Sequence, residues 1–328
     1  MFTRRKFSLT MGAMLATPSL QSAKAADTDA LRSAAAGLAQ LHSILVQRGD
    51  DVLLAYAPRG RGLKRHTNIK SCSKSVLALL LGSAIERGEI SGLSTRLGDV
   101  AAALIPHDAT PGVEDLTMLD LVTLRAGLQS TSGSNYGAWV SSRNWVSAVL
   151  RQPRIEPAGG RMIYSTGTTH VLGAALSIAT GESLLAQARE RLGLPLQIEI
   201  PPWTRDPQGF YFGGNEMALT PEAMLRVAVL MREGGRADGL QIISTDWVRR
   251  STQPQTRSQF SGLGYGLGWF ISPSGWLIAR GFGGQIIAAN AAMNLAVAIT
   301  SDSTQPARSQ GHFGDLMALI DGPVSDLA

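Results

Sequence analysis

The stretch Ser71-Cys-Ser-Lys74 runs directly into Ser75-Val-Leu-Ala-Leu-Leu-Leu-Gly-Ser-Ala-Ile85, which is followed by Glu86-Arg-Gly88. Apolar residues occupy most positions from 76 to 85, so the segment has hardly any polar face. This pattern predicts a buried helix, because a helix at the surface needs a polar side. Glycine is the favoured residue just past a helix end, so we expect the helix to stop at Gly88.

The two ends of the tetrapeptide carry the groups needed for acyl transfer. Ser71 and Lys74 are three residues apart, so on a helix they share one face and their hydroxyl and amine can meet. The helix start also points unpaired N–H groups at whatever Ser71 attacks. A buried lysine loses proton affinity, and its neutral amine can take a proton from serine. The alternative is structural, with Ser71 as a helix N-cap and Lys74 as a solvated residue of the first turn.

The N-terminus has the pattern of an export signal. Paired Arg4 and Arg5 precede a short apolar run, residues 11–20, and small residues surround a cut site after Ala25. This arrangement is typical of a twin-arginine signal peptide, so we expect residues 1–25 to be removed and the protein to be periplasmic or secreted. The alternative is an ordinary amphipathic N-terminal helix.

Charge and hydropathy exclude two kinds of partner. The first 25 residues carry four basic side chains and no acid, so without them the formal net charge falls from +5 to +1. We therefore expect no nucleic-acid partner, because such a partner requires a basic patch. No later run is long enough and free enough of charge to predict a membrane span.

The sequence predicts no disulfide, no metal site and no cofactor. Cys72 is the only cysteine, and the five histidines form no pair with ligand spacing. On a helix Cys72 points about 100° away from Ser71, so we interpret it as a small buried hydrophobe, with a rival nucleophile as the alternative. His170 is the one histidine near a candidate site, and a satisfied packing histidine is its alternative.

The order of predicted elements indicates an α+β fold with two packed lobes. Near the start, helical spacing covers 29–45 and a strand is predicted at 51–56. Further helices are predicted at 116–125, 139–150, 171–179, 221–231 and 316–320. Short apolar runs between turns predict antiparallel strands at 264–271, 275–279, 286–290 and 295–300. We expect a sheet lobe of 26–75 and 205–328 and a helical lobe of 76–204.

Two later stretches can complete a site. Beside a lysine, Tyr164 would lose its proton more easily and could act as a proton shuttle, although a core tyrosine is the alternative. In Arg280-Gly-Phe-Gly-Gly-Gln285, the glycines would let a strand approach a ligand closely and offer an N–H group to an oxyanion. The alternative for this stretch is a β-bulge.

Together these residues resemble the serine β-lactamase and penicillin-binding superfamily, in the branch similar to class C β-lactamases. The nucleophile motif of that family is similar to Ser71-Cys-Ser-Lys74, its Tyr-Ser-Asn motif to Tyr164-Ser-Thr166, and its third motif to Phe282-Gly283-Gly284. Residues 121–128 and 219–226 resemble two further family stretches. The resemblance covers nearly all of the chain after the signal and implies a mostly antiparallel sheet flanked by helices, plus a helical lobe, with the site between them.

The resemblance also implies an acyl-enzyme mechanism that needs no metal or organic cofactor. It makes Ser71 the nucleophile and lets Lys74 and Tyr164 move the proton. It places the oxyanion between the N–H groups of Ser71 and Gln285. The residues that it implies for substrate binding are Thr166, Phe282, Gly283 and Gly284.

Two departures from the family pattern bear on the substrate. Thr166 replaces the usual asparagine, and Phe282 replaces a lysine or histidine that contacts a substrate carboxylate. We therefore expect a small uncharged ester or amide, as for the esterase and nylon-oligomer hydrolase members, unless Arg280 supplies the missing charge. The rival functions are a β-lactamase or D-alanyl-D-alanine carboxypeptidase and, outside enzymes, a penicillin-recognising sensor.

Overall fold

The computed structural model describes the chain from residue 20 to residue 328, and its side chains from Asp27 onward. The paired arginines of the predicted export signal lie outside the described residues. The first described element, α1 (Leu20–Gly37), contains the predicted cut site after Ala25.

The helices and strands have the following bounds. The helices are α1 (Leu20–Gly37), α2 (Ser73–Glu86), α3 (Leu97–Ala101), α4 (Met118–Val122), α5 (Tyr136–Val140), α6 (Trp145–Leu150), α7 (Thr166–Thr180), α8 (Leu184–Ala188), α9 (Leu194–Leu196), α10 (Pro221–Arg232), α11 (Thr245–Ser251) and α12 (His312–Leu319). Short 3-10 or π turns are η1 (Lys70–Cys72), η2 (Ala102–Leu104), η3 (Gly133–Asn135), η4 (Arg189–Gly193), η5 (Ile320–Val324) and η6 (Ser325–Leu327). The strands are β1 (Leu41–Arg48), β2 (Asp51–Tyr56), β3 (Thr67–Asn68), β4 (Ala218–Leu219), β5 (Arg236–Ala237), β6 (Leu240–Gln241), β7 (Thr256–Arg257), β8 (Gly264–Tyr265), β9 (Phe270–Ile271), β10 (Leu277–Gly281), β11 (Gln285–Asn290) and β12 (Leu295–Ser301).

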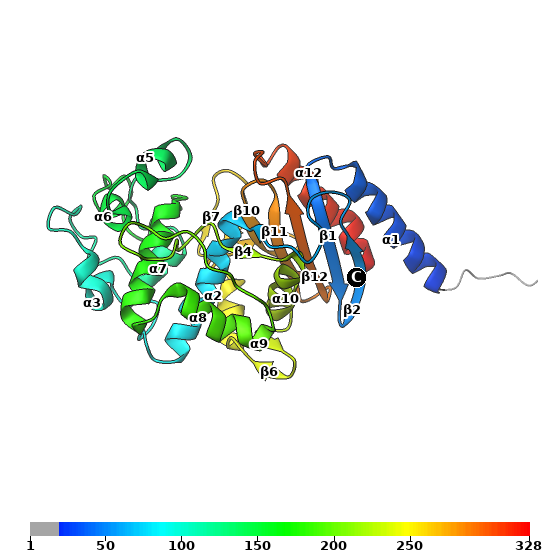
Figure 1. Ribbon diagram of the computed structural model, residues 1–328, viewed down its shortest axis with the longest axis horizontal. Coiled ribbons are helices and arrows are strands. Elements are labelled where there is room, and N and C mark those ends of the chain that lie inside the picture. The colour runs from blue at the N-terminus through cyan, green and yellow to red at the C-terminus, as the bar shows by residue number, and fades with distance from the viewer. Residues whose placement is uncertain (1–19) are drawn as a thin grey trace, which may run out of the picture.

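Both ends of the chain contribute to one antiparallel sheet. Its eight strands follow the order β2-β1-β12-β11-β10-β9-β8-β7 (Figure 1). The early strand β1 pairs with the last strand, so that Leu45 faces Ala298. The segment between these ends supplies most of the helices, which gather on one side of the sheet in Figure 1. The predicted fold class, a mainly antiparallel sheet flanked by helices, is confirmed.

The two faces of the sheet are packed with side chains of different size. In β12, Val297 and Ile299 join the hydrophobic cluster that also contains residues of α1 and α12. The alternate residues Ala296 and Ala298 join the cluster that contains residues of α2 and α10. Side chains of a strand alternate between faces, and small alanines let α10 lie close to the second face.

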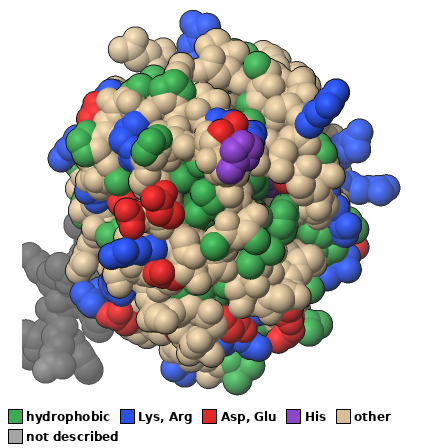
Figure 2. Space-filling view, turned by 90° about the vertical axis from the view of Figure 1, so that its left-hand side faces the viewer, with side chains coloured by type: hydrophobic (Ala, Val, Ile, Leu, Met, Phe, Trp, Pro, Cys, Tyr) green, Lys and Arg blue, Asp and Glu red, His purple; other side chains and the backbone are tan. Residues whose placement is uncertain are grey.

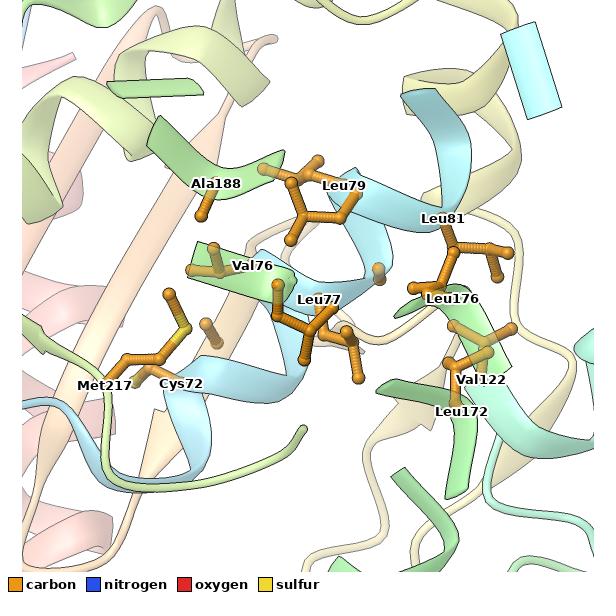
Figure 3. Close-up of a cluster of buried hydrophobic side chains, with 14 of the residues drawn as sticks. Cys72, Val76, Leu77, Leu79, Leu81, Val122, Leu172, Leu176, Ala188 and Met217 are labelled. Atoms are coloured by element: carbon orange, nitrogen blue, oxygen red, sulfur yellow. The ribbon is translucent and has the colours of Figure 1, made fainter. Parts of the chain in front are cut away.

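Helix α2 lies at the centre of the second cluster. All of its residues from Ser73 to Ala84 are buried, as predicted from the absence of a polar face. Figure 3 shows its side chains packed among those of α4, α7 and α8. The chain leaves the helix through Gly88, whose φ of 72° lies in the left-handed region that glycine adopts without strain. The packing of the whole helix therefore fixes the position of its first turn.

Two local predictions near the sheet are wrong. Helical spacing was expected through residues 29–45, but α1 ends at Gly37 and the chain continues as β1. Pairing of β1 with both β2 and β12 outweighs its helical periodicity. The strand predicted at 264–271 is instead a hairpin of β8 and β9, because Gly268 turns the chain at a φ of 79° and packs against α2.

The helix predicted at 139–150 is also divided in two. Helix α5 ends at Val140, and Asn144 starts α6 by accepting a hydrogen bond from the Ser147 N–H. Asparagine is a strong N-cap because its side-chain oxygen satisfies a free N–H of the first turn. The start of α10 at Pro221 is confirmed, with Thr220 as the N-cap.

The surface of the helical end carries charges of both signs. In Figure 2 acidic and basic side chains lie interspersed among polar ones over this face. In the described part of the chain, no single helix is long and apolar enough to cross a bilayer. Helix α7 and residues 184–196 reach that length only as a pair bent by 85°.

Candidate active site

Ser71 lies in a strained turn just before α2. It belongs to η1, and Lys70 before it has a φ of 50°, a left-handed value that residues other than glycine rarely adopt. Asn68 Oδ1 holds this turn by accepting from the Lys70 N–H at 2.8 Å. Ser73 Oγ donates to the Lys70 carbonyl at 2.6 Å. The N-cap of α2 is Cys72, so the alternative of Ser71 as a capping residue is not observed.

Lys74 is buried against Ser71. Only 3% of Lys74 is exposed, so the alternative of a solvated lysine is wrong. Its Nζ donates to Ser71 Oγ at 3.1 Å, to Thr166 Oγ1 at 3.2 Å and to the Gly214 carbonyl at 2.8 Å. Burial lowers the pKa of Lys74 from 10.5 to about 7, because desolvation penalises the ammonium ion. Much of the amine is therefore neutral near pH 7 and able to accept the Ser71 proton.

Tyr164 lies close to both Lys74 and Ser71. The Lys74 Nζ is 5.0 Å from the centroid of its ring. Burial raises the pKa of Tyr164 to about 12, although the hydrogen bond with Ser71 and the charge of Arg280 act in the opposite direction. The expectation that Tyr164 loses its proton more easily is therefore wrong, because desolvation outweighs the nearby charges. At neutral pH this residue is a proton donor.

A loop of small hydroxyl residues holds the Tyr164 segment in place. Ser130 Oγ donates to the Tyr164 carbonyl at 2.7 Å. Ser132 Oγ accepts from the Thr166 N–H at 2.8 Å and bonds Thr166 Oγ1 at 2.9 Å. Sequence analysis missed these residues, because serine-rich stretches are common in ordinary loops and their partners lie far along the chain.

His170 supports the carbonyl that anchors Lys74. Its ring is fully buried, with Nε2 3.0 Å from Asp206 Oδ2 and Nδ1 accepting from the Gly213 N–H at 3.3 Å. These contacts place the ring proton on Nε2, which donates to the carboxylate. Gly213 precedes Gly214, whose carbonyl accepts from Lys74. The histidine thus packs away from Ser71 but positions a partner of the lysine.

Ser71 opens into a cavity of about 550 Å³. Of the residues predicted to bind substrate, Thr166 and Phe282 line this cavity together with Ser71 and Tyr164. In the part of the chain that the structure describes, no group of three or more His, Cys, Asp and Glu side chains has the arrangement of a metal site. The hydroxyl of Ser71 and the phenol of Tyr164 therefore border the cavity, and the Lys74 amine reaches it through its hydrogen bond with Ser71.

Gln285 does not lie at the cavity, contrary to its predicted role in the oxyanion hole. It is fully buried at the start of β11, where it pairs with Gly281 of β10. The Gln285 side-chain amide donates to the Ser301 carbonyl at 2.7 Å, and the Gln285 carbonyl accepts from Cys72 Sγ at 3.4 Å. Burial also raises the pKa of the Cys72 thiol, so Cys72 is a buried hydrophobe rather than a nucleophile.

Gly283 and Gly284 shape the turn that carries Phe282 rather than the cavity wall. Both have positive φ values, 82° and 95°. A Cβ on Gly283 would lie 2.5 Å from the Asp302 carbonyl oxygen, and one on Gly284 would lie 2.8 Å from the His312 ring. The sequence located the glycines correctly, but their close approach is to the protein itself and not to a ligand.

Arg280 places a cation beside the cavity. Its guanidinium carbon lies 3.4 Å from the centroid of the Phe313 ring, and Nη2 donates to the Ala307 carbonyl at 3.4 Å and to Ser309 Oγ at 3.2 Å. Burial lowers the pKa of Arg280 to about 10, so the group stays charged at neutral pH. Within residues 27–328 no carboxylate forms an ion pair with Arg280. Its guanidinium instead contacts Phe313 of α12 and residues 307 and 309, which precede that helix.

The comparison with known families agrees with this geometry. Residues 34–321 match the family model described as Beta-lactamase. The chain belongs to the beta-lactamase family. The resemblance inferred from the three motifs is thereby confirmed over most of the chain.

Individual members of the beta-lactamase family resemble this chain at low identity. A 6-aminohexanoate-dimer hydrolase from Paenarthrobacter ureafaciens is 24% identical over 239 residues, which are 68% of this chain and 60% of that protein. The hydrolase EstCE1, described as having promiscuous acyltransferase activity, has a TM-score of 0.75 at 16% identity, covering 93% of this chain and 98% of that chain. A penicillin-binding protein homologue from Caulobacter crescentus has a TM-score of 0.75 at 15% identity, covering 93% and 97%. These structures share the fold.

Proposed function

We propose that the protein is a serine hydrolase that cleaves small esters or amides through an acyl-enzyme. The observation that carries this proposal is the 3.1 Å contact between Lys74 Nζ and Ser71 Oγ, at a lysine whose pKa is lowered to about 7. A neutral amine at this distance is a general base matched to neutral pH. Relatives named as a 6-aminohexanoate-dimer hydrolase and as a hydrolase with promiscuous acyltransferase activity support the reaction class.

The proposed reaction has two halves. Lys74 takes the proton of the Ser71 hydroxyl while Ser71 Oγ attacks the carbonyl carbon. The tetrahedral adduct then expels the alcohol or amine, which takes a proton from Tyr164 as Lys74 returns one to the phenol oxygen. In the second half, Lys74 takes a proton from water, and the hydroxide attacks the acyl-enzyme. Collapse of that adduct releases the acid and returns the proton to Ser71.

The oxyanion requires two N–H donors, and we assign these to Ser71 and Phe282. Phe282 replaces Gln285 in this role because it lies one residue beyond the pairing of Gly281 with Gln285 and borders the cavity. Ser71 is the middle residue of the 3-10 turn η1, which leads into α2. Two N–H groups fixed by packed backbone can stabilise the oxyanion without reorganising.

The rival functions differ in their substrates and in turnover. A β-lactamase or D-alanyl-D-alanine carboxypeptidase would prefer substrates with a carboxylate beside the scissile group. A penicillin-recognising sensor would acylate once and hold the product. We favour turnover, because the Lys74 amine that activates Ser71 can also activate the deacylating water.

The decisive experiment measures hydrolysis and covalent labelling together. The protein should hydrolyse p-nitrophenyl esters or a linear amide, and a fluorophosphonate should label Ser71 as judged by mass spectrometry. Ser71→Ala should lose both, whereas Cys72→Ala should keep both. Labelling without any turnover would favour the sensor, and a label on another residue with Ser71 free would refute the assignment.

We further propose that the protein is exported by a twin-arginine signal and acts in the periplasm or outside the cell. The support is Arg4 and Arg5 with the small residues around Ala25. Replacing both arginines with lysine in a cell that has this route should keep the protein in the cytoplasm. Unchanged export would rule out the route.

A further inference from the structure

The cavity at Ser71 is lined by two groups of side chains with different chemistry. Polar side chains of the first group are paired with each other: Lys70 Nζ bonds Glu216 Oε1 at 3.1 Å, and Asn215 Nδ2 bonds the Tyr136 hydroxyl at 3.1 Å. The second group comes from strands and turns of the sheet and is aromatic, with Phe260, Phe270 and Phe282. These contacts pair Lys70 with Glu216 and Asn215 Nδ2 with Tyr136, and among the described residues Asn215 Oδ1 is buried without a hydrogen-bond partner. The polar group therefore offers a ligand one free acceptor, whereas the aromatic group offers apolar surface.

Two of these rings are exposed to water. Phe260 is 79% exposed and Phe282 is 53% exposed. Between residues 27 and 328, they are the only aromatic members of the set of large exposed hydrophobic side chains. The other members are aliphatic and do not line this cavity: Val52, Ile155, Ile178, Leu194 and Leu240. Exposed rings gathered at one cavity indicate a binding surface for an apolar group.

The turn that carries Phe260 is ordered by its own hydrogen bonds. Ser258 Oγ accepts from the Phe260 N–H at 3.3 Å and from the Ser261 N–H at 3.4 Å. The Gly262 N–H donates to the Ser258 carbonyl at 2.9 Å, and Arg257 Nη1 donates to the Gly262 carbonyl at 2.9 Å. The phenyl ring is therefore presented from a closed turn rather than from a loose loop.

The second ring is fixed close to the nucleophile. Phe282 follows Gly281, which lies so near the nucleophile turn that a Cβ there would stand 2.4 Å from the Ile69 carbonyl oxygen. Ile69 is two residues before Ser71. The Gly284 N–H closes the turn by donating to the Gly281 carbonyl at 3.1 Å. An apolar group that contacts Phe282 would thus sit next to a carbonyl under attack by Ser71.

We propose that Phe260 and Phe282 bind a hydrocarbon part of the substrate, so that the preferred substrates are esters or amides with an extended or aromatic apolar group. This inference rests on the proposed hydrolase function and names its substrate class. A cavity of about 550 Å³ has the size of a small-molecule site. The apolar group belongs either to the acyl part or to the leaving part, and both make the same contact with a phenyl ring.

Two substrate series test the inference and separate these two sources. One series is p-nitrophenyl acetate, butanoate, hexanoate and octanoate, and the other is ethyl, butyl and hexyl acetate followed by acetate release. In one of the two series kcat/KM should rise about two- to fourfold per added methylene, the scale of burying one such group. A rise in the first series assigns the apolar group to the acyl part, and a rise in the second assigns it to the leaving part. Phe260→Ala and Phe282→Ala should each lower the ratio between the longest and shortest substrate by about tenfold. Leu240→Ala, which removes an exposed side chain away from the cavity, should leave that ratio unchanged.

Phe282→Leu should restore most of the ratio lost in Phe282→Ala, because the contact depends on apolar surface. The exposure of both rings means that the truncations should leave the melting temperature nearly unchanged. The inference would be overturned if wild-type kcat/KM did not change with chain length in either series. It would also be overturned if both alanine variants kept the wild-type ratio of kcat/KM between the longest and shortest substrate. Either result would leave the hydrolase proposal intact. Rates of labelling by ethyl and octyl fluorophosphonates give a second readout that needs no turnover. Failure of both hydrolysis and labelling would instead refute the proposed function.

Discussion

Replacement of Lys74 by methionine should abolish turnover yet make the folded protein more stable at low pH. Burial lowers the pKa of this amine from 10.5 to about 7, and each pH unit corresponds to about 1.4 kcal/mol. Carrying the charge in the folded state therefore costs on the order of 5 kcal/mol below pH 7. Methionine leaves the Gly214 carbonyl without its donor, which costs about 1–3 kcal/mol. We expect a net stabilisation of roughly 2–4 kcal/mol at pH 6.

The sign of the pH dependence provides the sharper test. The lowered pKa means that between about pH 7 and 10.5 the unfolded chain binds a proton that the folded protein releases. Wild-type stability should therefore rise relative to Lys74→Met across this window, by about 1.4 kcal/mol per pH unit. The loss of hydrogen bonds does not depend on pH, so it shifts the two curves without changing this slope.

Urea unfolding of both proteins at several pH values from 6 to 10 measures the difference directly. Lys64→Met removes an exposed lysine and controls for the loss of a lysine as such. A free-energy difference between wild type and Lys74→Met that is constant with pH would mean that Lys74 stays charged when folded. That result would remove it as the general base.

Three further predictions concern the groups around the nucleophile. Tyr164→Phe should lower kcat by about 10²-fold with an unchanged melting curve, because it removes a proton donor but keeps the ring; near-normal turnover would make Tyr164 a packing residue. Wild type should prefer an uncharged ester to a β-lactam or a D-alanyl-D-alanine peptide, and Phe282→Lys should narrow that preference; a wild-type preference for carboxylates that Arg280→Ala abolishes would reverse this interpretation. His170→Asn should shift the lower limb of the kcat/KM profile against pH, because the Gly214 carbonyl beside Lys74 loses its support; a changed melting temperature with an unmoved profile would show a purely structural role.

Local chemistry could be predicted where the signal lies within a few residues. The buried helix follows from its apolar run, and its stop from the glycine at position 88. The contact of Ser71 with Lys74 follows from their spacing of one turn. The Thr220-Pro221 start of α10 was equally clear. The predicted residues Thr166 and Phe282 also reach the cavity, although their motifs lie far from Ser71 in the sequence.

Predictions failed where the outcome depends on distant partners. The hydroxyl groups of Ser130 and Ser132 bond a segment 34 residues away, so no local pattern marks them. The register of the β10–β11 hairpin turns Gln285 into the sheet, and a prediction from motif spacing could not include that pairing. Tyr164 keeps its proton because of burial, which no nearby residue in the sequence reveals.

The sequence by itself determined the reactive pair, the buried helix beneath it and the α+β class, because hydrophobic periodicity and one-turn spacing are local properties. Only the tertiary structure decided the protonation states and the donors around them. It buried Lys74 without a carboxylate partner among the described residues, which lowers its pKa, and it brought Gly214 and Thr166 to the amine. It also left Phe260 and Phe282 exposed at one cavity from turns 22 residues apart. Desolvation and long-range proximity arise from packing, so they became visible only when the sheet and the helices were assembled.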